Sequence, residues 1–403
     1  MKNIIFILLS GLVIVSCEQK KESGINTGEY IGQNFKIYEE ITTEQIIEHI
    51  KYIALETDSL CLLQNPQQVK FINDTLFILD KENLFTFTNK GKFVAKIGNK
   101  GRAPTEDIHL TSFFVDSKNS YVAIFDNINS KILKYSFKGE FIESISIKQN
   151  IMQFVNQMDF LTKENAIICS YSLPFEPLSM PNSLSTISLK DYSIISAIPY
   201  KIKSTGRALV NFSSHPITLS QDSSLIPLCI EPFSNKIMGY VNDKFVVKYT
   251  VKTIDPIVSV QTLESLTHSF NNYFDVFENI QKNKKSVGIK NIYETTNYIL
   301  LSIGGKDKTY SALYDKKKKK GAFYLNYYSN ITSSYHDVLL GLSGSSSTYK
   351  DQFILLLNQP LQDIRNTYIQ ESKNQDFVSI LKATSEDDNP IIAFIELKDS
   401  IPF

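Results

Sequence analysis

Histidines are the side chains of this chain best suited to hold a metal, and each of the five stands alone: His49, His109, His215, His268 and His336. Zinc hydrolases that can be recognised from sequence carry paired histidines, as in His-x-x-x-His or His-Glu-x-x-His. Neither spacing occurs in this chain, and no Asp-x-Asp-x-Asp run suggests a calcium loop. We therefore expect no metal and no cofactor, although ligands far apart in sequence can still meet in a fold.

The serine-rich segment Gly341–Ser347 is the nearest approach to a nucleophile motif. A nucleophile elbow needs Gly-x-Ser-x-Gly at a strand-to-helix turn, and position 345 is Ser where Gly is required. The segment is predicted to be a flexible polar loop. No catalytic residue is assigned from the sequence.

Five consecutive lysines, Lys316–Lys320, form a dense positive charge between two strand-like runs. A solvated hairpin loop is the simplest interpretation, and contact with membrane phosphate or another polyanion is the alternative. Asp387, Asp388 and Asn389 are the closest approach to an acidic cluster. They are predicted to form a turn before a final strand.

The N-terminus has the order of a bacterial secretory signal. Lys2 is followed by the apolar run Ile4–Val15, then Ser16 and Cys17. This order resembles a lipobox, which predicts a signal peptide over residues 1–16 and lipidation of Cys17. An uncleaved signal anchor or a plain secretory peptide is the alternative. Residues 17–40, polar and containing several glycines, are predicted to be a flexible tether.

Composition favours a mostly β protein. Tyr and Phe together number 47, Trp is absent, and the charges balance at 42 basic and 42 acidic residues. Aromatic and β-branched residues favour pleated surfaces, and the neutral balance suggests no nucleic-acid partner. Cys61, Cys169 and Cys229 are widely spaced in apolar contexts, so buried structural thiols are expected rather than a disulfide framework.

Internal repeats predict the fold. Leu76–Asp80 recurs as Val122–Asp126, and Leu84–Ile97 recurs as Ile132–Ile145 with Gly91 and Gly139 at equivalent turns. Short alternating strands repeating every 40 to 50 residues are the signature of propeller blades. Six such units fill residues 41–403, although their faint boundaries also allow five or seven. The predicted fold is an all-β, six-bladed β-propeller.

Three further predictions concern how this ring is completed. The spacing of apolar residues predicts one helix over Val260–Lys282 and partial helix over Leu361–Leu381, both as short insertions. Lys51–Glu56 has no local partner before the first unit, and Ile391–Lys398 has none after the last. We expect these two segments to pair in one sheet, so that the N-terminal strand closes the last blade. Asp80 and Asp126 end equivalent strands and are expected to cap turns two residues on.

Three stretches carry a family resemblance: Tyr52–Thr57, Gly98–Glu106 and Ser385–Pro390. They resemble the six-bladed β-propeller lipoproteins of gut-dwelling Gram-negative bacteria, whose architecture is related to NHL-repeat propellers. That family commonly has a glycine-rich loop between the first two blades. In this chain Ala103 and Thr105 replace two of the expected glycines.

The resemblance implies little about activity, since fold does not fix function. Arg102, Glu106 and His109, in or beside the matching loop, are the candidate ligand rim, and a structural role holding adjacent blades is the stronger interpretation of the loop. We expect an outer-membrane lipoprotein of the cell envelope that acts as a non-catalytic binding or scaffold module. Its partners would be the membrane, through the lipid anchor, and a glycan, peptide or envelope protein. The alternative is a hydrolase, lyase or lactonase with its site at the central tunnel.

Overall fold

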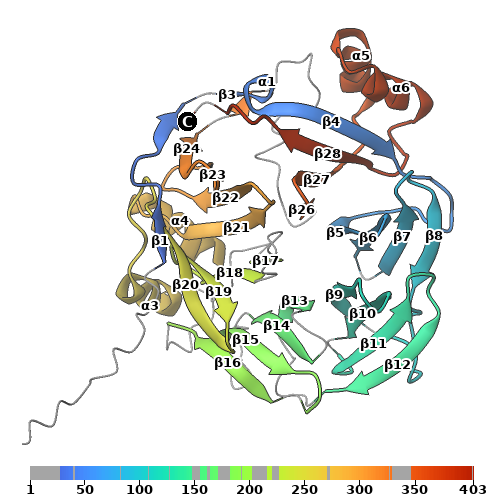
Figure 1. Ribbon diagram of the computed structural model, residues 1–403, viewed down its shortest axis with the longest axis horizontal. Helices are drawn as coiled ribbons and strands as arrows, with labels where there is room; N and C mark the ends of the chain where they lie inside the picture. The colour runs from blue at the N-terminus through green and yellow to red at the C-terminus, as the bar shows by residue number, and fades with distance from the viewer. Residues whose placement is uncertain are drawn as a thin grey trace, which may run out of the picture.

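The computed structural model is a closed ring of six β-sheet blades (Figure 1). It describes residues 28–39, 41–81, 83–107, 109–126, 128–147, 155–160, 164–170, 182–191, 193–201, 216–219, 227–269, 273–325, 327–328, 346–401 and 403. Each blade has four antiparallel strands that run in order from the centre of the ring outward. The prediction of a six-bladed propeller is confirmed.

The first three blades follow the chain without interruption. Their strands, from the innermost outward, are β5 (Pro66–Ile72), β6 (Thr75–Asp80), β7 (Asn83–Thr88) and β8 (Phe93–Ile97); β9 (Leu110–Asp116), β10 (Tyr121–Asp126), β11 (Lys131–Ser136) and β12 (Phe141–Ser146); and β13 (Val155–Phe160), β14 (Asn165–Ser170), β15 (Asn182–Ser188) and β16 (Ile194–Pro199).

The last three blades include segments from the N-terminus. Their strands are β17 (Ile217–Leu219), β18 (Pro227–Ile230), β19 (Lys236–Val241) and β20 (Lys244–Val251); β21 (Gly288–Glu294), β22 (Tyr298–Gly304), β23 (Thr309–Asp315) and β24 (Lys320–Tyr324); and β26 (Ser346–Tyr349), β27 (Gln352–Leu357), β28 (Ile391–Leu397) and β4 (Ile47–Ala54).

The repeat between blades 1 and 2 is confirmed in detail. The amides of Gly91 and Gly139 donate to the carbonyls of Thr88 and Ser136, each at 3.0 Å. Both glycines have positive φ, at 78° and 86°. Each hairpin also carries a register shift at the equivalent place, after Thr86 and after Lys134. Glycine is needed at these turns because side chains disfavour positive φ.

Ring closure follows the predicted pairing. β4 pairs antiparallel with β28, with Tyr52 opposite Ala393 and Ala54 opposite Ile391. The closing strand begins earlier than predicted, at Ile47, and ends at Ala54. Because its partner comes from the C-terminal end, the two ends of the chain hold one blade together.

A buried asparagine ties this closing blade to blade 1. The Asn389 side chain accepts from the amide of Leu63 at 2.7 Å and donates to the carbonyls of Glu56 and Cys61. Its own amide donates to Thr57 Oγ1 at 2.9 Å. The loop after the closing strand is therefore fixed to the residue just before the final strand.

The structure differs from the predicted tether over residues 29–38. β1 (Glu29–Ile31) pairs parallel with β20, and β2 (Lys36–Tyr38) pairs parallel with β24. These short strands add to the outer edges of blades 4 and 5. The backbone N–H and C=O groups on the free side of an edge strand are available to pair with another strand. The propeller domain thus begins before the predicted residue 41. β3 (Ile41–Thr42) then pairs with β25 (Tyr327–Tyr328), and α1 (Thr43–Ile46) leads into the closing strand.

The first helical insertion is described as two helices, α3 (Val260–Ser269) and α4 (Tyr273–Lys282), both within the predicted helical range, and residues 270–272 lie outside the described residues. Leu263, Val276 and Ile280 from the two helices share one buried cluster, which explains the apolar stripe that suggested a single helix. The second insertion is confirmed as α5 (Gln362–Glu371) and α6 (Gln375–Ala383). In Figure 1 this pair extends beyond β4 and β28 at the edge of the ring.

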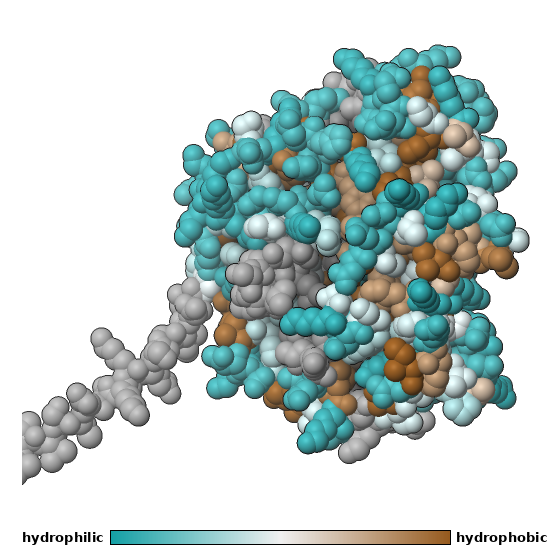
Figure 2. Space-filling view, turned by 45° about the vertical axis from the view of Figure 1, so that its right-hand side comes forward, coloured by the Kyte–Doolittle hydropathy of each residue, from teal (hydrophilic) through white to brown (hydrophobic). Residues whose placement is uncertain are grey.

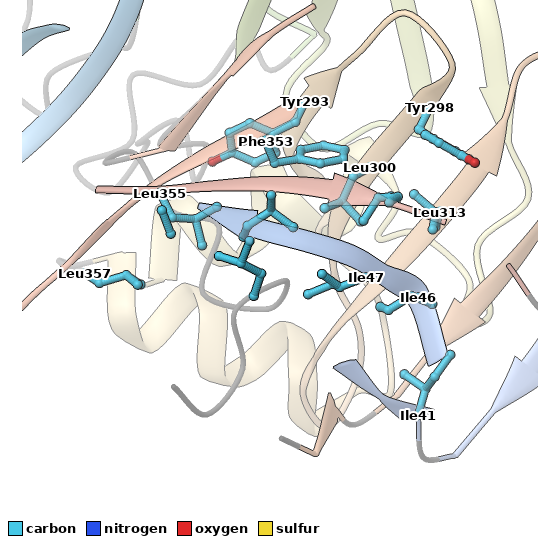
Figure 3. Packing of buried hydrophobic residues seen from close by; sticks show 14 of the residues in the cluster. Ile41, Ile46, Ile47, Tyr293, Tyr298, Leu300, Leu313, Phe353, Leu355 and Leu357 are labelled. Carbon is cyan, nitrogen blue, oxygen red and sulfur yellow. The ribbon is translucent and has the colours of Figure 1, made fainter. Parts of the chain in front are cut away.

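The apolar core is divided between neighbouring blades. The largest part joins blades 5 and 6, where side chains such as Leu300, Leu313 and Phe353 pack with Ile46 and Ile47 from the N-terminal segment (Figure 3). Middle strands such as β6 and β10 are buried along nearly their whole length because neighbouring blades cover both faces. Outer strands such as β12 are more exposed. Figure 2 shows hydrophobic patches scattered among hydrophilic residues on the surface in view. Within the described residues, no helix is long and apolar enough to cross a membrane.

Candidate functional site

A cavity of about 260 Å³ lies where the innermost strands converge. Five of the six blades contribute lining residues: Lys70 to Asn73 of blade 1, Val115 and Ser117 of blade 2, Asp159 of blade 3, Ile217 and Thr218 of blade 4, and Ser347 to Tyr349 of blade 6. These residues lie at or near the C-terminal ends of the innermost strands and the turns that follow. The cavity is therefore the mouth of the central channel on one face of the ring.

A cross-ring ion pair forms part of the cavity wall. Lys70 Nζ lies 3.0 Å from Asp159 Oδ2, joining the inner strands of blades 1 and 3. The same ammonium group donates to the carbonyl of Phe113 at 3.3 Å and lies 5.2 Å from the centre of the Phe113 ring. Both charged side chains are largely buried, at 15% and 6% exposed, so each neutralises the other in a poorly solvated place.

Neighbouring inner strands are also held together by side-chain bonds beside the cavity. The Gln157 side chain donates to the carbonyl of Ile217 at 3.1 Å and accepts from its amide at 3.3 Å. Ser112 Oγ accepts from the amide of Met158 at 3.0 Å. These bonds fix the strands that present the lining residues, and binding sites benefit from such rigid support.

One polar atom in the cavity wall has no partner. Ser347 is 7% exposed, and within the described part of the chain its Oγ makes no hydrogen bond. A buried hydroxyl usually finds a partner, so an exception needs an explanation. Ser347 belongs to β26, whereas the sequence predicted a flexible loop over Gly341–Ser347; residues 341–345 lie outside the described residues.

The predicted rim lies at the other end of the inner strand of blade 2. Arg102 and Glu106 are in the loop between β8 and β9, and His109 directly precedes β9, whereas Val115 and Ser117 reach the cavity at the far end of the same strand. The structure thus does not bring the predicted rim residues to the cavity. Arg102 is exposed, and the Glu106 carboxylate accepts from the amide of Ala103 at 2.9 Å.

The contacts of this loop fix the connection between blades 1 and 2 to β11 of blade 2. The Lys131 ammonium group of β11 donates to the carbonyls of Ala103, Pro104 and Glu106, and the Tyr135 hydroxyl donates to that of Thr105 at 2.8 Å. Burial, followed by the nearby carboxylates, raises the pKa of Tyr135 to about 12.

An ion pair closes the base of the same loop. Asp107 Oδ1 lies 2.8 Å from Lys100 Nζ. Burial raises the pKa of the Asp107 carboxyl, and the ion pair with Lys100 opposes that rise. Ligand binding by Arg102, Glu106 and His109 remains a prediction.

The other polar segments have structural partners. Lys316 and Lys318 belong to the turn that joins β23 to β24. Lys316 Nζ lies 2.8 Å from the buried carboxylate of Glu294, and Lys318 Nζ lies 3.4 Å from the carboxylate of Asp315. This confirms the hairpin expected for the lysine run. The predicted turn before the final strand is also present, with the amide of Ser385 donating to Asp388 Oδ2 at 2.7 Å.

Asp80 and Asp126 end equivalent strands of blades 1 and 2 and accept hydrogen bonds from different parts of the chain. Asp126 accepts from the amide of Ile128, two residues on, as predicted. Asp80 accepts from the amides of Gln64 and Asn65, before the first strand of its blade, and residue 82, whose amide was the predicted donor, lies outside the described residues. The sequence repeat therefore predicts the aspartate acceptor in each blade, whereas the donors depend on the tertiary structure around it.

Histidines and cysteines add no metal cluster in the described part of the chain, where no group of three or more His, Cys, Asp or Glu side chains could hold an ion. His215 and His336 lie outside the described residues, as does Cys17. Cys61, Cys169 and Cys229 are buried thiols, as predicted, and form no disulfide with one another. Burial raises the pKa of the Cys229 thiol, which makes it a structural rather than a reactive group.

Sequence reasoning missed the cavity residues. A single charge in the innermost strand of a unit was the available signal, with Lys70 between Val69 and Phe71 and Asp159 between Met158 and Phe160. Such a charge is unusual in a buried strand unless it is paired. The pairing could not be read from the sequence, because 89 residues and a whole blade separate Lys70 from Asp159.

Six blades closed by an N-terminal strand define this protein as a six-bladed β-propeller. The family described as Domain of unknown function (DUF4934) matches residues 30–396, and the chain belongs to this family. No curated protein matches the chain.

Two crystal structures share the fold. A protein from Bacteroides fragilis NCTC 9343, described as exported, is similar with a TM-score of 0.71 and 21% identity over 92% of this chain and 99% of that one. A member of the DUF4221 family from Bacteroides vulgatus ATCC 8482 is similar with a TM-score of 0.51 and 9% identity over 88% of this chain and 98% of that one. At these identities the likeness concerns the fold alone.

Proposed function

We propose that the protein is an outer-membrane lipoprotein of the cell envelope that binds a ligand, without catalysis, through the face of the ring that carries the central cavity. The N-terminal signal, the cysteine at position 17 and the exported structural relative support export and anchoring. The ligand belongs to a glycan, a peptide or a partner protein of the envelope.

The cavity is the observation that carries this proposal. It has a rigid wall from five blades, a neutralised ion pair and an apolar lining that includes Phe71, Val115 and Tyr349. Concave, largely apolar sites with a few fixed polar groups are where proteins bind small ligands. An aromatic and apolar wall favours binding over the enzyme alternative, which requires several acids, bases or metal ligands to converge.

Photo-crosslinking in intact cells tests this proposal. A photoreactive amino acid is introduced at Thr348, in the cavity wall, and separately at Arg102, in the exposed loop at the opposite end of the inner strands. The proposal predicts adducts at Thr348 and none at Arg102. Adducts at Arg102 alone would move the site to the rim predicted from sequence and overturn the cavity as the binding site.

A further inference from the structure

The size of the central cavity limits what it holds. Sites for drug-sized ligands usually measure about 300–1,000 Å³, and this cavity measures about 260 Å³. It therefore accommodates one small ring or the end of a longer molecule. It has no room for a folded partner or an extended peptide.

The charge of the cavity wall disfavours an ionic ligand. Among the described lining residues the charged groups are Lys70 and Asp159, which pair with each other at 3.0 Å. A carboxylate or ammonium group entering the cavity would have to break this pair or remain uncompensated, and an unpaired charge in a poorly solvated site is costly. A neutral ligand avoids both outcomes.

The polar and apolar surfaces of the wall match a molecule that carries both kinds of surface. Four serine and threonine side chains line the cavity: Ser117, Thr218, Ser347 and Thr348. Each hydroxyl can donate and accept, as can the hydroxyls of a ligand. Phe71, Val115 and Tyr349 provide the apolar area against which the C–H groups of a ring can pack.

The Ser347 hydroxyl is the polar group of the cavity wall that makes no hydrogen bond in the described part of the chain. Its residue is more than nine-tenths buried and lines the cavity. A buried hydroxyl without a partner calls for an explanation. The Ser347 Oγ has less than 1 Å² of exposed surface, so a ligand hydroxyl in the cavity would pair with it after rotation of the side chain about χ1.

We propose that the central cavity binds a neutral sugar residue, with its hydroxyls on Ser347 and its hydroxyl neighbours and its C–H face on the apolar wall. This inference rests on the proposed function and names the ligand class for the same site. A small, uncharged ring with alternating hydroxyl and C–H surfaces is the chemistry that this wall complements.

A glycan array tests the inference with the full lipidated chain in detergent. The array carries neutral sugars, uronic acids and amino sugars, and peptides are printed beside them. Ser347→Ala removes the hydroxyl and should weaken binding to neutral sugars about 5- to 10-fold. Ser347→Val fills space in the cavity and should abolish binding. Ser185→Ala is the matched control, because Ser185 Oγ is also buried without a partner but lies outside the cavity lining.

The outcomes separate this inference from the proposed function. Binding to neutral sugars that Ser347→Val removes and Ser185→Ala keeps, with melting temperatures unchanged, supports the inference. Binding only to charged sugars or peptides overturns the sugar assignment and leaves a ligand-binding propeller. Sugar binding that survives Ser347→Val overturns the cavity as its location. Absence of binding on the array overturns the inference, and absence of adducts at Thr348 in cells overturns the proposed function as well.

Discussion

Replacing Asn389 with alanine should destabilise the whole ring, because this one side chain joins the closing blade to blade 1. The substitution removes three hydrogen bonds, of which those to the backbones of Cys61 and Leu63 are buried and that to the carbonyl of Glu56 is partly buried. The carbonyl of Glu56 still accepts from the Cys61 thiol at 3.3 Å, so the amide of Leu63 and the carbonyl of Cys61 are the two groups that lose their partner. Each such group costs about 1–3 kcal/mol, and a value of about 1.5 kcal/mol for each gives a loss of about 3 kcal/mol.

The loss should be visible in thermal melting. An unfolding entropy of about 2.1 cal/mol/K per residue gives about 0.8 kcal/mol/K for a ring of this size, so a loss of about 3 kcal/mol lowers the melting temperature by about 4 °C. Asn89→Ala is the control, since Asn89 makes one exposed side-chain bond to Asp74. It should stay within about 0.5 kcal/mol of the wild type.

Two results would refute this reasoning. Equal melting temperatures for Asn389→Ala and Asn89→Ala would show that the closure does not depend on this residue. An early, separate transition for Asn389→Ala would show that one end of the chain frays while the other blades remain folded. A single transition shifted downward is the expected outcome, because blades that close a ring support one another.

Three further predictions follow from other contacts. Gly91→Ala should cost at least about 1 kcal/mol more stability than Gly139→Ala, measured by thermal melting. A Cβ at Gly91 would overlap the carbonyl oxygen of Ala54, whereas the atom nearest to a Cβ at Gly139 is 3.0 Å away. Equal losses for the two variants would contradict this prediction. Tyr135→Phe should destabilise the protein at neutral pH, and this loss should shrink as the pH rises from about 10 to about 12. The pKa of Tyr135 is raised in the folded state, so the stability that its neutral hydroxyl contributes is lost over this pH range. A stability difference that stays constant across this pH range would refute this prediction. Cys17→Ala should release the protein from the membrane fraction, and retention through detergent-free washes would disprove the lipid anchor.

Local patterns made the ring predictable. Alternating strands and turn glycines such as Gly91 and Gly139 repeat in the sequence because every blade must form the same hairpins. Closure was also predictable, since Lys51–Glu56 and Ile391–Lys398 were strands without neighbours. Both inferences depend on residues that are close in sequence or on a strand that must find a partner.

The site was less predictable because it depends on residues that only the closed ring brings together. Lys70 and Asp159 come from blades that are not adjacent in the chain, so neither shows its partner in the sequence. Asp80 illustrates the same limit, because the sequence does not show that the amides of Gln64 and Asn65, in a loop before the blade, donate to it. The tether was predicted too long because its polar composition does not reveal that β1 and β2 pair with the edge strands β20 and β24 or that Ile31 enters the core.

A tryptophan placed in the cavity wall gives the most direct test of the central channel as the binding site. The chain contains no Trp, so Tyr349→Trp creates a single indole fluorophore among the lining residues. Titration with the neutral glycan that the wild type binds most tightly should give a saturable change in fluorescence, which Ser347→Val in the same background should abolish. Retained glycan binding with no change in the indole fluorescence would contradict this account and place the site elsewhere on the ring.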